Sequence, residues 1–453
     1  MIDLNEVLDT TGKRIELGVY CVARGDKQTG LSLFQSASDL EPDNIEALVN
    51  TAAVLIGMKE YEAAEVFTRR ALKVDPNHAH VLGTMAQIEQ QKGDYVAAKQ
   101  YFCESLKSDQ NNATTLLNYA YMLQLGGDFY GALSAYTRVR DINPMDFSAR
   151  FQRSMCMLTI ADSPDEWREA LDEYEIRRML MKFAAVSPTP QYTGQIDTKA
   201  AVLLICEQGL GDAVMMARYI RQLVGERVGR VYIHCNKNWV WLMSKVEGVS
   251  GVFSDISEVP PHDYHMPMMS LMRAGFTPSR FYDKAKYLKV YSAGQNQDKY
   301  KIGLCWQGNP EHGNDRYRSI HSTEFWKYLG GIENVEFISL QTPEVNAVSM
   351  PPVVTEANLP TVQKLAETIA GLDMVVTVDT AILHIAGALG IPTIALIPSN
   401  PDWRWRTVDA ATPWYPTVQL VRAKRPLDWD DALEKAAQKV KTRIKAAGVH
   451  NEA

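Results

Sequence analysis

Small and apolar residues in the first third of the chain repeat with a spacing of 34 residues. Prolines stand at Pro42, Pro76 and Pro144, and Gln110 takes the matching place in SDQNN. Three further series keep this phase: Asp26, Glu60, Asp94 and Asp128; Gly30, Ala64, Ala98 and Ala132; and Ala37, Ala71, Ser105 and Val139. Small side chains let two helices approach closely, so each repeat predicts a pair of packed helices.

This helix–turn–helix period resembles the tetratricopeptide (TPR) repeat. The resemblance predicts a superhelix of about five repeats over residues 1–184, because no single repeat buries its apolar face alone. The fifth repeat is degenerate and contains an insertion at ADSPDE, residues 161–166. The concave groove of such a superhelix suggests recruitment of a protein or peptide, and a spacer or homodimerisation module is the alternative.

The pattern changes after the linker 185–194, where β-branched runs alternate with helical stretches. Such alternation predicts parallel strands joined by helices. Strands are expected at 200–206, 230–235, 301–306, 335–340, 374–378 and 393–397, and helices at 211–224, 237–246, 322–329, 361–371 and 380–389. We therefore expect two Rossmann-like halves, 185–295 and 296–453, that face a cleft.

The end of the chain adds one more predicted helix. Four apolar residues of this segment fall on one helical face: Leu433, Ala436, Val440 and Ile444. A helix with one apolar face buries that face against a core. We expect this helix to pack back on a sheet.

The sequence EQGLGD, residues 207–212, forms a strand-to-helix corner with almost no side chains. A dinucleotide site needs a third glycine, where Val214 stands, and an acidic residue after the second strand, which ends in HCN. The Lys-Ser/Thr pair of a P-loop is absent too. Asp212 begins the helix, so it is either a helix cap or a general base in the cleft.

Charge, apolar runs and cysteine spacing exclude several classes of protein. The net charge of −7 gives no electrostatic case for non-specific nucleic-acid binding. The N-terminus lacks the basic and apolar regions of a signal peptide, and no apolar run is long enough to span a membrane. The six cysteines are scattered, without a CxxC pair, which favours buried thiols in the cytoplasm over disulfides or structural zinc.

Three ordered stretches resemble bacterial TPR proteins with a C-terminal heptosyltransferase-like glycosyltransferase: EQGLGDAVMMARY, GLCWQGNPEHGNDRYRSI and DTAILHIAGALGIPTIALIPSNPDWRW. The resemblance implies a GT-B fold, with the nucleotide-sugar donor on the C-terminal half and the acceptor facing the N-terminal half. By motif match it implies that Asp212 is the catalytic base. The neighbouring Gln208, Gly209 and Gly211 would then face the acceptor, the glycines leaving space for it.

The donor half contains a second strand-to-helix corner at Asp379, Thr380 and Ala381. Free amides at a helix N-terminus suit a diphosphate, and His384 lies one turn further on the same face. The polar loop 306–321 adds further donor candidates: Asn309, His312, Arg316 and Arg318. A polar helix start and a flexible surface loop are the structural alternatives.

Other donor-half residues carry weaker signals. Trp403 and Trp405 either line a sugar site or plug the underside of the sheet, and Gln341 and Glu367 are weak candidates for contacts to the base or ribose. No D-x-D motif stands in a matching place. We therefore expect no metal and no cofactor, with arginines and the helix dipole offsetting the charge of the leaving diphosphate.

The sequence thus predicts an inverting, metal-independent glycosyltransferase with a TPR superhelix that recruits the acceptor or a partner protein. Its substrate would be a nucleoside-diphosphate sugar. Two alternatives stay open: a TPR scaffold whose transferase domain has lost catalysis, and a nucleotide-sugar epimerase of the same fold. The sequence identifies neither the sugar, nor the nucleobase, nor the acceptor.

Overall fold

A computed structural model describes residues 10–180, 187–275, 286–292, 299–341, 354–407 and 410–448. The chain divides into two compact units, Met1–Cys156 and Met157–Ala453. This division lies earlier than the expected domain boundary after residue 184, so the helices Pro164–Tyr174 (α11) and Arg177–Leu180 (α12) group with the second unit. In the described residues, no helix is long and apolar enough to cross a membrane.

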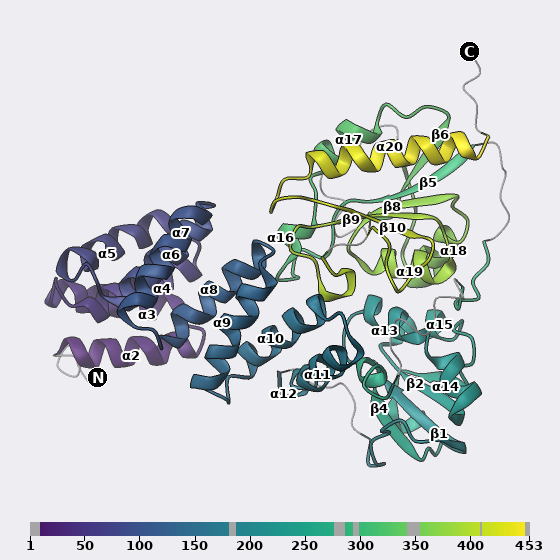
Figure 1. Ribbon diagram of the computed structural model, residues 1–453, viewed down its shortest axis with the longest axis horizontal. Helices are drawn as coiled ribbons and strands as arrows, with labels where there is room; N and C mark the ends of the chain where they lie inside the picture. Colours follow the sequence, from purple (N-terminus) through teal and green to yellow (C-terminus); the bar gives the residue numbers. More distant parts are fainter. Residues whose placement is uncertain are drawn as a thin grey trace, which may run out of the picture. The chain divides into compact units, whose positions relative to one another are not determined.

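The first unit consists of antiparallel helix pairs, as the 34-residue period predicts (Figure 1). Its helices are α2 (Thr11–Ala23), α3 (Lys27–Leu40), α4 (Ile45–Gly57), α5 (Tyr61–Val74), α6 (Ala79–Lys92), α7 (Tyr95–Ser108), α8 (Ala113–Leu125) and α9 (Phe129–Ile142). Helix α10 (Phe147–Ile160) continues across the division between the units.

The repeated acidic and small residues of this unit have separate physical roles. Asp94 begins α7, where its side chain accepts a hydrogen bond from the Ala97 amide at 2.9 Å, and Asp128 does the same for α9. These carboxylates satisfy amides that the first helical turn leaves free. Ala64 and Ala98 are fully buried between packed helices. A larger side chain at either position would push the helices apart.

The second unit contains two parallel sheets, which together form the two Rossmann-like halves of a GT-B fold. The first sheet has the strand order β3-β2-β1-β4 and the second has β10-β9-β8-β5-β6-β7. The strands of the first are β1 (Asp197–Ile205), β2 (Val228–His234), β3 (Gly251–Phe253) and β4 (Tyr264–Pro267). Those of the second are β5 (Tyr300–Cys305), β6 (Val335–Ser339), β7 (Val354–Glu356), β8 (Met374–Val378), β9 (Thr393–Ile397) and β10 (Val418–Arg422).

The helices of the second unit follow its strands along the chain (Figure 1). Besides α11 and α12 they are α13 (Leu210–Ala217), α14 (Ile220–Glu226), α15 (Val240–Met243), α16 (Asp315–Arg318), α17 (Ser322–Leu329), α18 (Val362–Ile369), α19 (Ala381–Leu389) and α20 (Asp430–Ala446). The helix expected at 211–224 is two helices, α13 and α14, with Arg218 and Tyr219 between them. The short strands β3, β4, β7 and β10 were not predicted.

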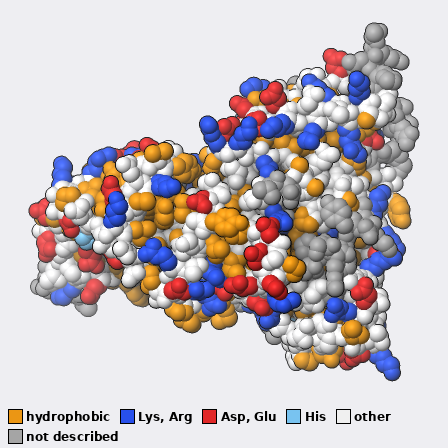
Figure 2. Space-filling view, viewed as in Figure 1, with side chains coloured by type: hydrophobic (Ala, Val, Ile, Leu, Met, Phe, Trp, Pro, Cys, Tyr) orange, Lys and Arg blue, Asp and Glu red, His pale blue; other side chains and the backbone are white. Residues whose placement is uncertain are grey.

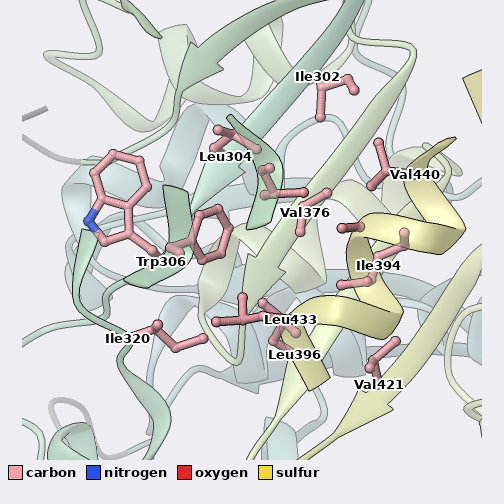
Figure 3. Close-up of a cluster of buried hydrophobic side chains, with 14 of the residues drawn as sticks. Ile302, Leu304, Trp306, Ile320, Val376, Ile394, Leu396, Val421, Leu433 and Val440 are labelled. Carbon is pink, nitrogen blue, oxygen red and sulfur yellow. The ribbon is translucent and has the colours of Figure 1, made fainter. Parts of the chain in front are cut away.

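The predicted packing of the C-terminal helix is confirmed. Leu433 and Val440 of α20 lie in one buried cluster with Leu304, Val376 and Ile394 from three neighbouring strands of the second sheet (Figure 3). The helix therefore covers one face of that sheet. Its apolar stripe at helical spacing is what directs it there.

The strand order of both sheets reverses at the strand that begins each half. In the second sheet β5 lies between β8 and β6, and in the first β1 lies between β2 and β4. Ligands of open parallel sheets bind outside the carboxyl ends of the strands at such a reversal. The corner after β1 and the corner after β8 both occupy this place.

Candidate functional site

The first turns of α13 and α19 touch each other at Gly211. A Cβ atom built on Gly211 would lie 2.7 Å from Cδ2 of His384 and 3.5 Å from the Cα of Ala381. Glycine is therefore needed here because two helices approach closely. This reason differs from the expected one, since the His384 ring fills the space that we assigned to the acceptor.

Asp212 lies in the first turn of α13 and makes two different contacts. Its Oδ2 accepts a hydrogen bond from the Gly209 amide at 3.0 Å, and its Oδ1 forms an ion pair with Arg404. The first contact satisfies a free amide at the helix N-terminus. The side chain remains 20% exposed, so it caps its own helix and is also accessible at the corner.

Arg404 approaches Asp212 from a short 3₁₀ turn, Trp403–Trp405 (η5). Its Nη1 also donates to Oδ1 of Asp402 at 2.5 Å, and its guanidinium lies 4.6 Å from the centre of the Trp403 ring. Burial alone would lower the pKa of Arg404, but the carboxylates of Asp212 and Asp402 outweigh it and raise that pKa. One buried cation thus holds two carboxylates.

The backbone that follows this turn is strained. Arg406 has φ 52° and ψ −165°, a conformation that non-glycine residues rarely adopt. The guanidinium of Arg422 donates to the carbonyls of Arg406, at 2.9 Å, and of Trp405. The Arg406 side chain is held by the Ala161 carbonyl at 3.0 Å and by Asp162. The surrounding contacts therefore keep this turn in one conformation.

Both tryptophans of the turn are buried, with 1% of each residue exposed. Trp403 packs edge-on against Trp167 and Tyr174 of α11 and against Trp414. These contacts favour the packing interpretation of Trp403 over the sugar-lining one. Gln208, expected on the acceptor side, donates from Nε2 to the Tyr174 hydroxyl at 2.8 Å.

His384 is a neutral, packed residue. Its Nδ1 lies 2.9 Å from the Tyr415 hydroxyl, and its ring centre lies 5.3 Å from that of Trp405. Burial, followed by the charges of Arg404 and Arg218, lowers the pKa of His384 to about 3. The ring is therefore uncharged at neutral pH, and its expected contact to a phosphate stays a prediction, as a hydrogen bond without added charge.

Arg318 is anchored beside the second corner. Its Nη1 donates to the Asp379 carbonyl at 3.1 Å, and its Nε donates to Asp315 at 3.1 Å. A Cβ on Gly308 would lie 2.7 Å from Nη2 of Arg318, so this glycine makes room for the guanidinium. The structure brings Arg318 to the start of α19, and its role in binding the donor stays a prediction.

The other residues of the polar loop 306–321 lie further out. Asn309 and Arg316 are exposed, and the Asn309 side chain accepts from the Glu311 amide at 2.9 Å within its own turn. Burial and the charge of Arg318 lower the pKa of His312. Gln341, a weak candidate for a nucleotide contact, instead accepts from the Trp306 amide at 2.8 Å and orders the start of the loop.

Thr380 and Asp379 form the start of α19. The Thr380 hydroxyl lies 3.4 Å from that of Thr377, and Thr380 provides no side-chain cap to the helix. Burial, followed by the charge of Asp402, raises the pKa of Asp379 to about 6, although Arg318 and Arg404 oppose this. This carboxyl is therefore one titrating group at the corner near neutral pH.

A buried charge network behind the first corner was not predicted. Arg177, fully buried, donates to Glu207 at 2.9 Å, to Glu175 at 2.6 Å and to the Ser270 hydroxyl at 2.7 Å. Burial raises the pKa of Glu207 above its usual range, and the charge of Arg177 offsets only part of this rise. The network joins α12 to the loop after β1. No spacing in the sequence indicates it, because its members come from three separate segments.

No group of three or more His, Cys, Asp or Glu side chains within the described part of the chain is arranged to hold a metal ion. The positive charge near both corners comes from arginines. Arg318 and Arg404 make contacts directly at the starts of α19 and α13, respectively.

Three segments of the chain match family models. Residues 22–88 and residues 79–112 match models of the tetratricopeptide repeat. Residues 353–439, which include α19 and Arg404, match glycosyltransferase family 9 (heptosyltransferase). The C-terminal part is a glycosyltransferase family 9 domain. The N-terminal part carries TPR repeats, so the expected family resemblance is confirmed for both.

No curated protein matches this sequence. Two solved structures illustrate its similarity to TPR proteins. A thermophilic TPR protein of Thermus thermophilus is 16% identical, with a TM-score of 0.33, over 38% of this chain and 96% of that one. The PilF protein of Pseudomonas aeruginosa is 17% identical, with a TM-score of 0.32, over 36% and 75%.

The contact between α13 and α19 predicts a stability effect. Gly211→Ala should lower the free energy of unfolding of the second unit by about 1–3 kcal/mol, because the added Cβ overlaps the His384 ring. Denaturant unfolding followed by tryptophan fluorescence measures it, since all nine tryptophans lie at Trp167 or beyond. Gly225→Ala in α14 is the control, because its Cβ would meet nothing within 4 Å. Equal effects of the two changes would contradict the close approach.

The raised pKa of Asp379 predicts that stability falls as pH rises. A carboxyl whose pKa is about 6 in the folded state, against 3.8 ordinarily, binds its proton more tightly when folded. The unfavourable contribution is absent below about pH 3, grows between these pKa values and is complete above about pH 7. Asp379→Asn should therefore stabilise the second unit by up to about 3 kcal/mol at pH 7 and by less than about 0.2 kcal/mol at pH 3. A pH-independent difference, measured by the same fluorescence method, would refute this.

Proposed function

We propose that this chain transfers a sugar from a nucleoside-diphosphate sugar to an acceptor hydroxyl, with inversion at the anomeric carbon. The observation that carries the proposal is the contact at Gly211, which joins the corner with Asp212 to the N-terminus of α19. An acidic side chain and a set of free helix amides thus lie side by side. The glycosyltransferase family 9 match covers the second of these corners.

In the proposed reaction, Asp212 accepts the proton of the acceptor hydroxyl. The hydroxyl oxygen forms a bond to the anomeric carbon, and the bond from that carbon to the phosphate oxygen breaks. Its electron pair leaves with the nucleoside diphosphate, so attack and departure occur on opposite faces of the sugar. A carboxylate positioned for this step contributes about 10²–10⁴-fold in rate.

The donor diphosphate would bind at the start of α19. The amides of Ala381 and its neighbours carry the positive end of the helix dipole, and Thr380 leaves its hydroxyl without a capping role. Arg318 adds a charge that Asp315 and the Asp379 carbonyl already hold in place. Asn309 and Arg316, on the exposed loop, would contact the donor only after the loop closes over it.

The TPR repeats would recruit the acceptor or a partner protein. Exposed apolar side chains recur one repeat apart, at Val96 with 81% and Tyr130 with 70% of the residue exposed. Figure 2 shows hydrophobic side chains among charged ones on the visible face of the repeats. Exposed apolar groups of this kind favour contact with another protein. A protein or peptide acceptor is therefore the class to test first.

Calorimetry with a panel of nucleoside diphosphates and nucleotide sugars tests the donor half of the proposal. The donor that binds is then incubated with the chain and with a cell extract, and intact-mass spectrometry detects a sugar added to an acceptor. Absence of binding at millimolar concentration would reject the transferase proposal. Binding without transfer or hydrolysis would favour a scaffold, and an isomeric sugar product would favour an epimerase.

Asp212→Asn separates a base from a helix cap. The amide oxygen can still accept from the Gly209 amide but cannot take a proton, so we expect turnover to fall by about 10²–10⁴-fold. Because the ion pair with Arg404 is lost as well, unfolding of the variant is followed by tryptophan fluorescence to show that it is folded. A folded Asn variant with full turnover would mean that Asp212 is only a cap.

Arg318→Ala should weaken nucleoside-diphosphate binding by about 1–3 kcal/mol, because a charge-assisted contact to phosphate is lost. Arg318→Lys, which keeps the charge without the forked geometry, should fall between the alanine variant and the unaltered chain. Arg230→Ala, on the exposed part of β2, is the control. Unchanged affinity in Arg318→Ala, measured by calorimetry, would place the diphosphate elsewhere.

A further inference from the structure

The contacts of Arg404 connect the proposed base, Asp212, with the proposed diphosphate site at the start of α19. Its guanidinium forms ion pairs with Asp212, from the corner after β1, and with Asp402, which directly precedes its own turn. Only 9% of its side chain is exposed. A buried guanidinium that bridges two carboxylates from different parts of a site is a strong, directional contact. If Arg404 released Asp212, Oδ1 of Asp212 would be free to accept a hydrogen bond from the acceptor hydroxyl.

Each oxygen of the carboxylate that the proposed reaction requires already has one partner, although the side chain is 20% exposed. Oδ1 of Asp212 is engaged by Arg404, and Oδ2 accepts the Gly209 amide. An acceptor hydroxyl has to hydrogen-bond to one of these oxygens before its proton can move. The Gly209 contact belongs to the helix N-terminus, so the Arg404 contact is the one that can be given up.

The same guanidinium also lies near the proposed diphosphate site. Its partner Asp212 follows Gly211, which touches Ala381 at the start of α19, and the ring of the next residue, Trp405, lies 5.3 Å from that of His384. Nε of this guanidinium is buried and has no hydrogen-bond partner within the described residues. A phosphate group arriving at α19 would therefore meet a cation with one donor to spare.

We propose that Arg404 exchanges partners: it binds Asp212 while the donor is absent and binds the donor diphosphate once that group reaches α19. Arg404 is then a positioning residue that frees Oδ1 of Asp212 only when a donor is bound. The inference rests on the proposed function and adds an order to it, with the donor bound before the base becomes available. No covalent bond forms or breaks in the exchange.

The surroundings of Arg404 suit such an exchange. Asp402 holds Nη1 at 2.5 Å and also accepts the Arg404 amide at 3.1 Å, so the side chain keeps one partner throughout. The Arg422 guanidinium donates to the Arg406 carbonyl at 2.9 Å and so anchors the backbone that follows the turn. A diphosphate offers more negative charge and more acceptor oxygens than one carboxylate, and guanidinium groups match phosphate geometry.

A double-mutant cycle on the affinity of the full chain for ADP, GDP, CDP and UDP tests the exchange by calorimetry. Asp212→Asn removes the competitor for Arg404, so affinity for the diphosphate that binds should rise by about fivefold or more. Arg404→Gln should lower affinity. In that background Asp212→Asn should change affinity by less than about twofold. Arg221→Gln, in an exposed ion pair with Glu247, is the control for loss of an arginine.

The outcomes of the cycle separate the exchange from the proposed function. An equal gain from Asp212→Asn in both backgrounds would mean that Asp212 repels the diphosphate directly, and it would overturn the exchange alone. Absence of diphosphate binding by the unaltered chain would overturn the proposed function and the exchange with it.

A measurement on the unaltered chain covers the case in which Arg404→Gln does not fold. Labelling of carboxylates with a carbodiimide and an amine, followed by peptide mass spectrometry, reports the accessibility of Asp212. The exchange predicts that labelling of Asp212 increases when the diphosphate that binds is added. Unchanged or reduced labelling would overturn it. Glu247, half-buried between α15 and β3 and paired with Arg221, serves as the internal reference.

Discussion

The close approach of α13 and α19 at Gly211 is the constraint on which the site depends. It places in contact the first turns of two helices that follow strands of two different sheets. Any side chain larger than hydrogen at this position would push the two helices apart. Each helix follows a strand at or next to the reversal in strand order of its own sheet. The contact therefore brings together the two places where open parallel sheets bind ligands.

Charge is concentrated at this contact and is largely compensated. Arg404 pairs with Asp212 and Asp402, Arg318 with Asp315, and behind the corner Arg177 pairs with Glu207 and Glu175. Buried ion pairs add little to stability compared with apolar packing, so their frequency here needs another explanation. In the proposed transfer, these ion pairs hold the reacting groups in a fixed orientation.

Local pattern in the sequence predicted the repeats, the alternating strands and helices, and the C-terminal helix on the second sheet. It also placed Asp212 at a strand-to-helix corner and Arg318 on the polar loop 306–321, which the structure brings to the start of α19. It could not predict the partners of these residues, because Arg404 and Asp212 are far apart in the chain and no period links them. For the same reason His384 looked like a phosphate ligand, whereas burial beside Tyr415 and Trp405 makes it neutral.

The most direct test of the account is a crystal structure of the full chain with the nucleoside diphosphate that binds it. We expect the diphosphate at the N-terminus of α19, within hydrogen-bond distance of the Ala381 amide and Arg318, with Arg404 turned from Asp212 toward a phosphate oxygen. A diphosphate bound away from α19, with the Asp212–Arg404 pair intact, would contradict it.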